Sequence, residues 1–220
     1  MTDDDRPKTG LDDPRAVPIL TAEHWSLLSA RTLGYQEMFG RATIFVGVLS
    51  GTIVALALLA QATRFGHETL VAAALLLPVT LYIGIATFIR SVAINYEDAL
   101  WLEGMNLLRN AYVRIVPEVA PFFVTGHEPG ANAGPLAHGT TQDVRSMATS
   151  LTTTSGVVAA LNSVAAGSFT SDIAALAGAT FGIVALVGAA VSLVSAVAHV
   201  RYAARFRRRH APRMKATTER

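Results

Sequence analysis

The chain has 220 residues, of which 51% are hydrophobic and only 15% are charged. Soluble domains usually contain about 25% charged residues, so this composition excludes an ordinary soluble domain. The absence of cysteine excludes disulfides, thiolate metal ligands and cysteine nucleophiles. The formal net charge is only +2, and the basic residues concentrate near the C-terminal end beside an apolar stretch. We therefore expect no nucleic acid among the partners.

Residues 1–20 predict a disordered acidic tail. Asp and Pro are frequent there and apolar residues are few, a composition that cannot bury a core. A secretory signal would need a basic start followed early by a short apolar core. Because neither is present, we expect the first long apolar stretch to act as an uncleaved insertion signal.

Residues 21–41 predict an amphipathic cytoplasmic helix that leads into the first apolar stretch. Thr21 is suited to cap its start. A largely aromatic stripe then recurs at helical spacing. It consists of Trp25, Leu28, Thr32, Tyr35 and Phe39. We expect this stripe to pack on another cytoplasmic helix, and a place at the membrane interface is the alternative.

Four stretches contain no Asp, Glu, Lys or Arg, and each is at least as long as the roughly 20 residues that cross a bilayer. They are 42–63, 69–89, 146–171 and 173–200. Because short connections force antiparallel pairing, residues 42–90 and 146–200 predict two transmembrane hairpins of an all-α membrane protein. The third stretch is rich in Ser and Thr, and a re-entrant segment or a cytoplasmic helix is its alternative.

The basic residues are distributed unevenly around these stretches. Five precede the first, one lies between the first and second, four lie between the second and third, and eight follow the fourth. Positive residues mark the cytoplasmic side, so four crossings place seventeen of the eighteen inside. This pattern predicts a multi-pass protein of the plasma membrane with both termini cytoplasmic. Without the third crossing, nine basic residues would lie outside.

Residues 201–220 form a basic cytoplasmic tail. Clustered basic side chains beside a membrane span attract anionic lipid, and they also fix the orientation of the span. We expect lipid headgroups to be contacted by Arg205, Arg207, Arg208 and Arg209.

Residues 91–116 predict a second amphipathic cytoplasmic helix. Its charged and polar residues, including Glu103 and Asn106, are expected on the face opposite the apolar stripe. The helix either continues the second span or lies on the membrane, and packing against residues 21–41 fits its mixed charges better. Asn95, Glu97 and Asp98 are expected to be the solvated helix start, with cation binding as the alternative.

Residues 117–145 predict a flexible cytoplasmic loop, because Pro and Gly recur throughout them. The segment holds the only cluster resembling metal ligands, which is His127, Glu128, His138 and Asp143. Its spacing matches no compact metal motif, so we expect a solvated loop and no metal site, cofactor or catalytic residue in this chain.

Small residues recur at intervals of three or four in the apolar stretches, a pattern that lets helices approach closely in lipid. The expected helix-packing residues are Gly47, Gly51, Gly178 and Gly182. They serve either packing within the chain or association of two copies. The hydroxyl groups of the third stretch offer a different possibility, the lining of a pore. The candidates for pore lining are Thr149, Thr153 and Ser163.

Several motifs resemble a group of uncharacterised actinobacterial four-span integral membrane proteins. One motif runs from Trp25 through Arg31 and Glu37 to Arg41, ahead of a Gly/Ala-rich stretch; the others are residues 97–106, 116–118 and 123–126. The resemblance covers most of the chain and implies a four-span fold without an assigned activity. The architecture is also similar to two-span effector domains of bacterial defence systems, which are thought to form pores.

The composition and spacing favour a non-enzymatic structural or interaction protein that self-associates and binds a cytoplasmic protein. The alternative is an oligomeric channel or membrane-disrupting effector lined by the third span. A membrane enzyme that uses His127 and His138 is a weaker third hypothesis. No charged residue is expected inside a span, which argues against proton relays, ion-coupled transporters and intramembrane proteases.

Overall fold

The computed structural model describes residues 10–123 and 152–218, and their side chains up to residue 209. These ranges contain four long α-helices, one 3-10 helix and no strand, so the described chain is all-α, as predicted. The elements are α1 (Ala16–Ala62), α2 (His67–Ile115), η2 (Pro117–Phe122), α4 (Thr154–Leu176) and α5 (Phe181–Thr218). By length and composition each of the four α-helices can cross a membrane, as expected of a multi-pass membrane protein.

Helix α1 begins at Ala16 rather than beside Thr21, so the prediction that residues 1–20 all lie outside a helix is wrong for 16–20. A turn precedes the helix, in which the Ala16 amide donates to the Asp13 carbonyl oxygen at 2.8 Å. Pro18 falls in the first turn, where its missing amide hydrogen costs nothing because helical amides there have no partner. Pro18, one of the prolines on which the prediction of a disordered tail rested, is therefore compatible with the start of a helix.

Helix α2 is continuous from the second apolar stretch to Ile115. This decides between the two alternatives for residues 91–116, which extend the second candidate span rather than forming a separate helix. Pro78 lies inside the helix without ending it. The turn before α2 uses positive backbone φ angles at Arg64 (51°) and Phe65 (60°).

The turn between α4 and α5 lies five to eight residues later than the charge pattern predicts. Asp172 belongs to α4, and the chain reverses at residues 177–180. Gly178 has a φ of 79°, and the amides of Gly178 and Ala179 donate to the carbonyls of Ala175 and Ala174 at 2.9 and 3.0 Å. These two bonds form a Schellman motif, the common helix ending in which glycine occupies the left-handed position.

Two predicted irregular segments are partly helical. Helix α5 runs on through the basic residues to Thr218, so residues 201–218 of the expected tail continue the fourth candidate span. In the expected loop 117–145, the first six residues form η2. The rest of that loop beyond residue 123 lies outside the described residues.

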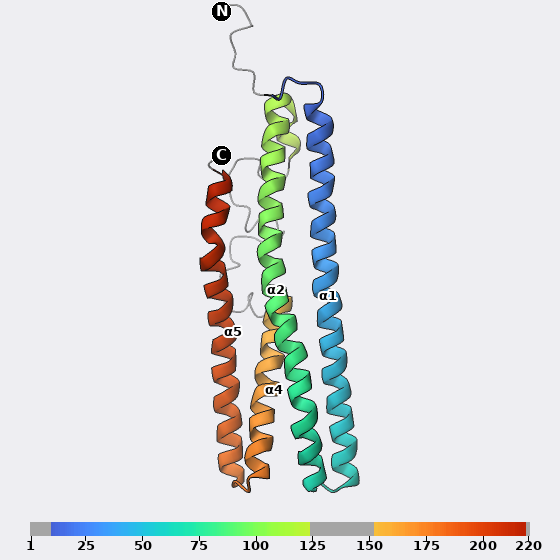
Figure 1. Ribbon diagram of the computed structural model, residues 1–220, viewed down its shortest axis with the longest axis vertical. Coiled ribbons are helices and arrows are strands. Elements are labelled where there is room, and N and C mark those ends of the chain that lie inside the picture. Colours follow the sequence, from blue (N-terminus) through green and yellow to red (C-terminus); the bar gives the residue numbers. More distant parts are fainter. Residues whose placement is uncertain (1–9, 124–151, 219–220) are drawn as a thin grey trace, which may run out of the picture. The chain divides into compact units, whose positions relative to one another are not determined.

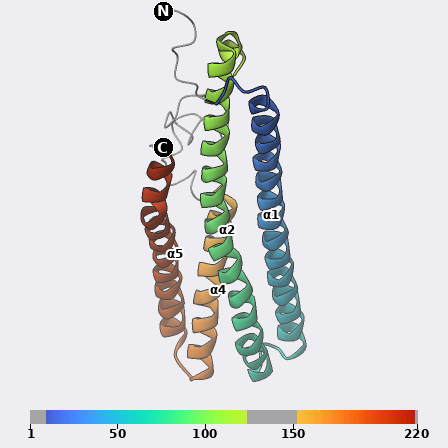
Figure 2. The same cartoon turned by 45° about the horizontal axis from the view of Figure 1, so that its top comes forward.

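The helices divide into two compact units. The second unit contains residues 36–94 and 146–210 and is a bundle of four helices (Figures 1 and 2). Its core is built from Phe45, Phe88, Val92 and Val158, against which Phe206 packs. Each helix contributes to this core. The α1–α2 and α4–α5 turns lie at the same end of the second unit (Figure 1).

The first unit pairs the start of α1 with the second half of α2, within residues 1–35 and 95–145. Leu27 lies against Gly104, where a Cβ would be 3.0 Å from a Leu27 methyl. The rings of His24 and Tyr112 stack at 6.2 Å. Glu103 and Asn106, which were expected on the face opposite the apolar stripe, are both buried.

The aromatic stripe of α1 packs on another helix only in part. Tyr35 of the stripe bonds to α2, but Trp25 and Phe39 are mostly exposed, and Leu28 is exposed as well. Leu27 and Arg31, which are not in the stripe, also face α2. Helical spacing identified a stripe, but the polar partners on α2 decided which face of the helix turned inward.

Candidate functional site

The first unit contains a buried carboxylate that joins its two helices. Asp98 is 2% exposed, and its Oδ1 accepts a bond of 2.6 Å from Arg31 Nε. The Tyr35 hydroxyl donates to Asp98 Oδ2 at 3.1 Å. The prediction of a solvated Asp98 is therefore wrong, and both carboxylate oxygens meet donors from α1. Burial raises the pKa of Tyr35, so this hydroxyl keeps its proton at neutral pH.

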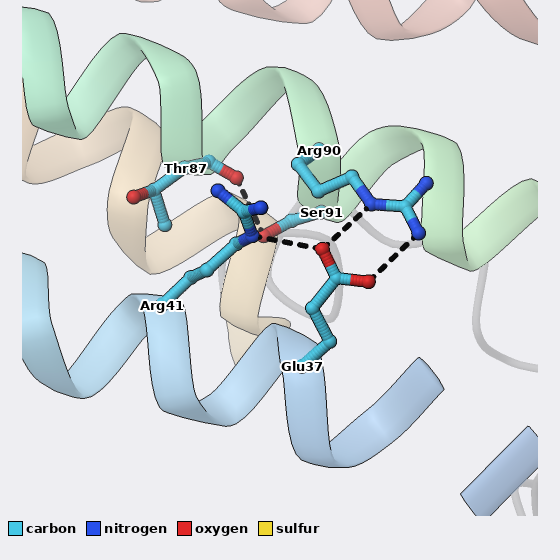
Figure 3. A network of polar contacts seen from close by, with 5 residues as sticks. All are labelled: Glu37, Arg41, Thr87, Arg90 and Ser91. Carbon is cyan, nitrogen blue, oxygen red and sulfur yellow. Dashed lines mark hydrogen bonds and ion pairs between the residues drawn. The ribbon is translucent and has the colours of Figure 1, made fainter. Parts of the chain in front are cut away.

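A second ion cluster joins the same helices inside the second unit (Figure 3). Arg90 on α2 donates from Nε and Nη2 to the two carboxylate oxygens of Glu37 at 2.9 and 2.8 Å. Arg41 Nε donates to Glu37 Oε1 at 2.9 Å. The Arg90 bonds, helped by Arg41, lower the pKa of Glu37 from 4.5 to about 2. Glu37 lies outside the charge-free stretches, and the cluster carries an excess of one positive charge.

A pair of threonines makes a polar contact between the charge-free parts of α1 and α2. Thr52 and Thr80 are both buried, and their hydroxyl oxygens lie 3.0 Å apart. The Thr80 hydroxyl also bonds the Leu76 carbonyl at 3.1 Å. Each hydroxyl thus has an acceptor, which is the condition for placing polar groups among apolar helices.

At the centre of the second unit, Asn162 of α4 inserts against α1 and α2. Its side chain is 1% exposed, and neither Oδ1 nor Nδ2 has a hydrogen-bond partner among the described residues. A Cβ on Gly84 would overlap Asn162 Oδ1 and lie 2.6 Å from Phe45 Cε2. Gly84 is therefore the position at which α1, α2 and α4 can meet.

Helices α4 and α5 contact one another through glycines and serines. Ser171 Oγ donates to the Val184 carbonyl at 3.0 Å. A Cβ on Gly167 would overlap the Gly188 carbonyl oxygen and the Ser192 hydroxyl. The sequence pattern of small residues did not single out Gly84 or Gly188, because contact depends on helix rotation as well as spacing.

A groove of about 470 Å³ opens where α4 and α5 pass Leu70 of α2. Its polar lining is Ser168, Ser171, Asp172 and Ser192. Asp172 is 8% exposed, and its Oδ2 has no partner among the described residues. Asp172, expected between the third and fourth spans, lies inside helix α4, the third candidate span.

The glycines expected to pack make no close helix contact among the described residues. Gly47, Gly51 and Gly182 lie on exposed surfaces of their helices, and a Cβ on any of them would meet no described atom within 4 Å. Gly178 lies in the α4–α5 turn rather than in a helix contact. The described part of the chain therefore does not use these four glycines for packing.

The expected pore-lining residues do not form one surface. Thr153 caps α4, where its hydroxyl accepts a bond of 3.1 Å from the Gly156 amide. Ser163 is buried and donates to the Ala159 carbonyl at 2.7 Å. Thr149 lies outside the described residues, as do His127, Glu128, His138 and Asp143.

The described residues include no group of three or more His, Cys, Asp or Glu that is able to hold a metal ion. The arginines expected to meet lipid, Arg205 and Arg207 to Arg209, are exposed on α5. His199, on the same helix, lies edge-on to Phe88 at 4.5 Å, and its Nδ1 is 2.7 Å from the Ser195 carbonyl oxygen.

Comparison of the chain with protein-family models, with curated proteins and with solved structures finds no match. Functional inference therefore rests on the contacts of the described residues.

Proposed function

We propose that this chain is a non-enzymatic membrane protein that self-associates through the outward face of α1. The observation that carries the proposal is the unused small-residue stripe. Gly47 and Gly51 are four residues apart on an exposed face, and the close approaches inside the chain use Gly84, Gly167 and Gly188 instead. In lipid, a small-residue stripe flanked by apolar side chains favours contact between helices.

The composition of that face supports a second copy as the occupant. Ile44, Val54 and Leu58 are exposed and lie on the same side of α1 as the two glycines. The opposite side of α1 carries Phe45 and Thr52, which are buried in the bundle. On the outward face, large apolar side chains therefore lie on either side of the two glycines. This arrangement allows the backbone of an identical helix to approach closely.

Single cysteines test the interface directly, because the chain contains no cysteine of its own. Val54 and Ile53 are both 58% exposed, but only Val54 lies on the glycine face. We expect Val54→Cys to form a covalent dimer in native membranes on mild oxidation and Ile53→Cys to remain monomeric. Gly51→Leu in the Val54→Cys background should reduce the dimer several-fold. Equal cross-linking at both positions would contradict the proposal.

We further propose a four-span topology built of two transmembrane hairpins, with both termini and the first unit on the cytoplasmic side of the plasma membrane. Charge within the second unit supports it. Arg41 and Arg90 share Glu37, and Phe88, two residues before Arg90, contacts Tyr202 near the arginines of α5. At the opposite end, the α1–α2 turn carries the single basic residue Arg64. A basic end and a nearly neutral end fit the positive-inside rule.

In this topology the first unit is the part available to a soluble protein. Its exposed side chains include Trp25 and Leu28, which lie on one face of α1. Exposed aromatic residues are enriched at protein interfaces. We propose that this face meets a cytoplasmic protein. Cross-linking from Trp25→Cys should capture that partner, and a Glu23→Cys variant, at an exposed position on another face of α1, should not.

A second candidate function, an oligomeric channel or membrane-disrupting effector, is favoured by the polar groove at Asp172. Hydroxyl groups and a carboxylate suit an ion path better than a lipid contact. The lining residues of such a path would be Ser168, Asp172 and Ser192 rather than Thr153 and Ser163. Purified protein in liposomes should then pass cations, and Asp172→Asn should lower the flux at least several-fold, with Ser50→Ala as the unaffected control.

A further inference from the structure

We propose that the groove between α4 and α5 binds an alkali-metal cation, with Asp172 as its charged ligand. The starting observation is a buried carboxyl oxygen without a partner. Asp172 is 8% exposed and its Oδ2 has no hydrogen-bond partner among the described residues. Burying an ionised carboxylate without a partner is unfavourable, so a cation in the groove would stabilise the folded chain.

The described residues that line the groove supply no positive charge. Among the described residues that line the groove, α2 contributes Leu70, and α5 contributes Val184, Ala185, Gly188, Ala189 and Ser192. None of these side chains carries a charge or titrates. Asp172 also lies near the C-terminal end of α4, where helical carbonyl groups add partial negative charge. Both features increase the attraction of the groove for a cation.

The neutral donors in the groove are oxygens of the kind that hard cations prefer. Ser168, Ser171 and Ser192 line it together with Asp172. Ser171 gives its hydroxyl hydrogen to the Val184 carbonyl, which leaves its oxygen lone pairs free to face an ion. The described lining offers a single carboxylate, whereas protein sites for divalent ions usually draw on more than one. One negative charge matches one monovalent ion.

The size of the groove indicates that the ion keeps some of its water. Its volume is about 470 Å³, and one water molecule takes up about 30 Å³ in the liquid. Several waters fit beside the ion and complete its coordination. A partly hydrated ion in a groove between two helices is held by few direct protein contacts, so we expect weak, millimolar binding.

A hydrophobic carbodiimide tests the site, because it modifies a protonated carboxyl among apolar groups and an ion bound to that carboxyl blocks the reaction. Purified full-length protein in lipid nanodiscs is treated in 100 mM choline chloride, NaCl or KCl at equal ionic strength. The adduct on Asp172 is measured by peptide mass spectrometry. We expect NaCl or KCl to reduce the adduct at least five-fold relative to choline, and the more effective salt identifies the ion.

Variants separate binding from an indirect effect of salt. Ser168→Ala combined with Ser192→Ala should raise the salt concentration for half-protection several-fold, whereas Ser50→Ala on the exposed face of α1 should leave it unchanged. Asp172→Asn should abolish the adduct. The wild-type protein should bind radioactive sodium, and the Asp172→Asn variant should not. Labelling that is equal in all three salts means that Asp172 holds only a proton, and this result overturns the proposal. Equal sodium binding by Asp172→Asn overturns it as well. Neither readout depends on self-association, so the cysteine cross-linking result does not affect this test of cation binding.

Discussion

Gly84 is one of the glycines of the second unit at which an added side chain has no room. An added Cβ would overlap Asn162 Oδ1 and press on Phe45, and both neighbours are themselves buried. We expect Gly84→Ala to destabilise the protein by about 1–3 kcal/mol, the usual cost of overpacking a core. Unfolding of the purified protein in mixed micelles provides the measurement.

The matched control for this substitution is Gly40→Ala, because a Cβ on Gly40 meets no atom within 4 Å. Alanine there should be neutral or stabilise α1 by up to roughly 1 kcal/mol through helix propensity. If both variants unfold at the same denaturant concentration, the contact between α2, α4 and α1 at Gly84 is not as described.

Glu37 predicts a pH dependence. Its pKa is lowered from 4.5 to about 2 by Arg90 and Arg41, so the folded state favours the carboxylate. The stabilisation is therefore fully present above the unfolded pKa and is lost as the pH falls from about 4.5 towards 2. We expect Glu37→Gln to be less stable than wild type at pH 7, and the difference to shrink at pH 3. A difference that stays constant between these pH values would show that Glu37 is not ionised in the folded cluster. Because the side chain is partly exposed, the effect will be modest.

Helices α1 and α2 are joined in the charge-free region by the hydroxyl pair Thr52 and Thr80. A double-mutant cycle with Thr52→Val and Thr80→Val isolates this contact. Hydrogen bonds between membrane helices contribute about 0.6 kcal/mol on average, so we expect a coupling of that size. Additive effects of the two substitutions would mean that the hydroxyls do not bond to each other.

The existence of the four apolar helices was predictable from the sequence, but their ends were not. The boundary predicted at Asp172 relied on charge alone, and a single carboxylate does not end a helix. Gly178 ends helix α4, because it adopts the left-handed conformation of a Schellman motif. The glycine at 178 was noted only for its spacing from Gly182, so its role as a turn was missed.

Rotation of the helices explains the errors at the candidate site. The aromatic stripe that starts at Trp25 was expected to pack on another helix, but Asp98 bonds Arg31 and only the Tyr35 end of that stripe, and Trp25 is exposed. Residues far apart in the chain determine which face of a helix is buried. The spacing of residues within one helix does not identify those partners. The same limit hid Asp172, which became an intramembrane candidate once α4 was seen to extend past it.

The distribution of basic residues is a property of the whole molecule and underlies the proposed four crossings. The third candidate span is the least apolar, with a mean hydropathy of 1.2 against 2.2 or more for the others. Its crossing matters most, because an odd number of crossings would put the termini on opposite sides. Both turns of the second unit lie at one end of the bundle (Figure 1), as two complete hairpins require.

Cysteine accessibility measures this central claim most directly. Phe65 in the first turn, Phe181 at the second and Phe122 in η2 are 80%, 87% and 80% exposed, and the chain has no other cysteine to label. In intact cells, a membrane-impermeant maleimide should label Phe65→Cys and Phe181→Cys, and should label Phe122→Cys only after the membrane is permeabilised. Labelling of Phe122→Cys in intact cells, or protection of just one of the two turns, would contradict the four-span account.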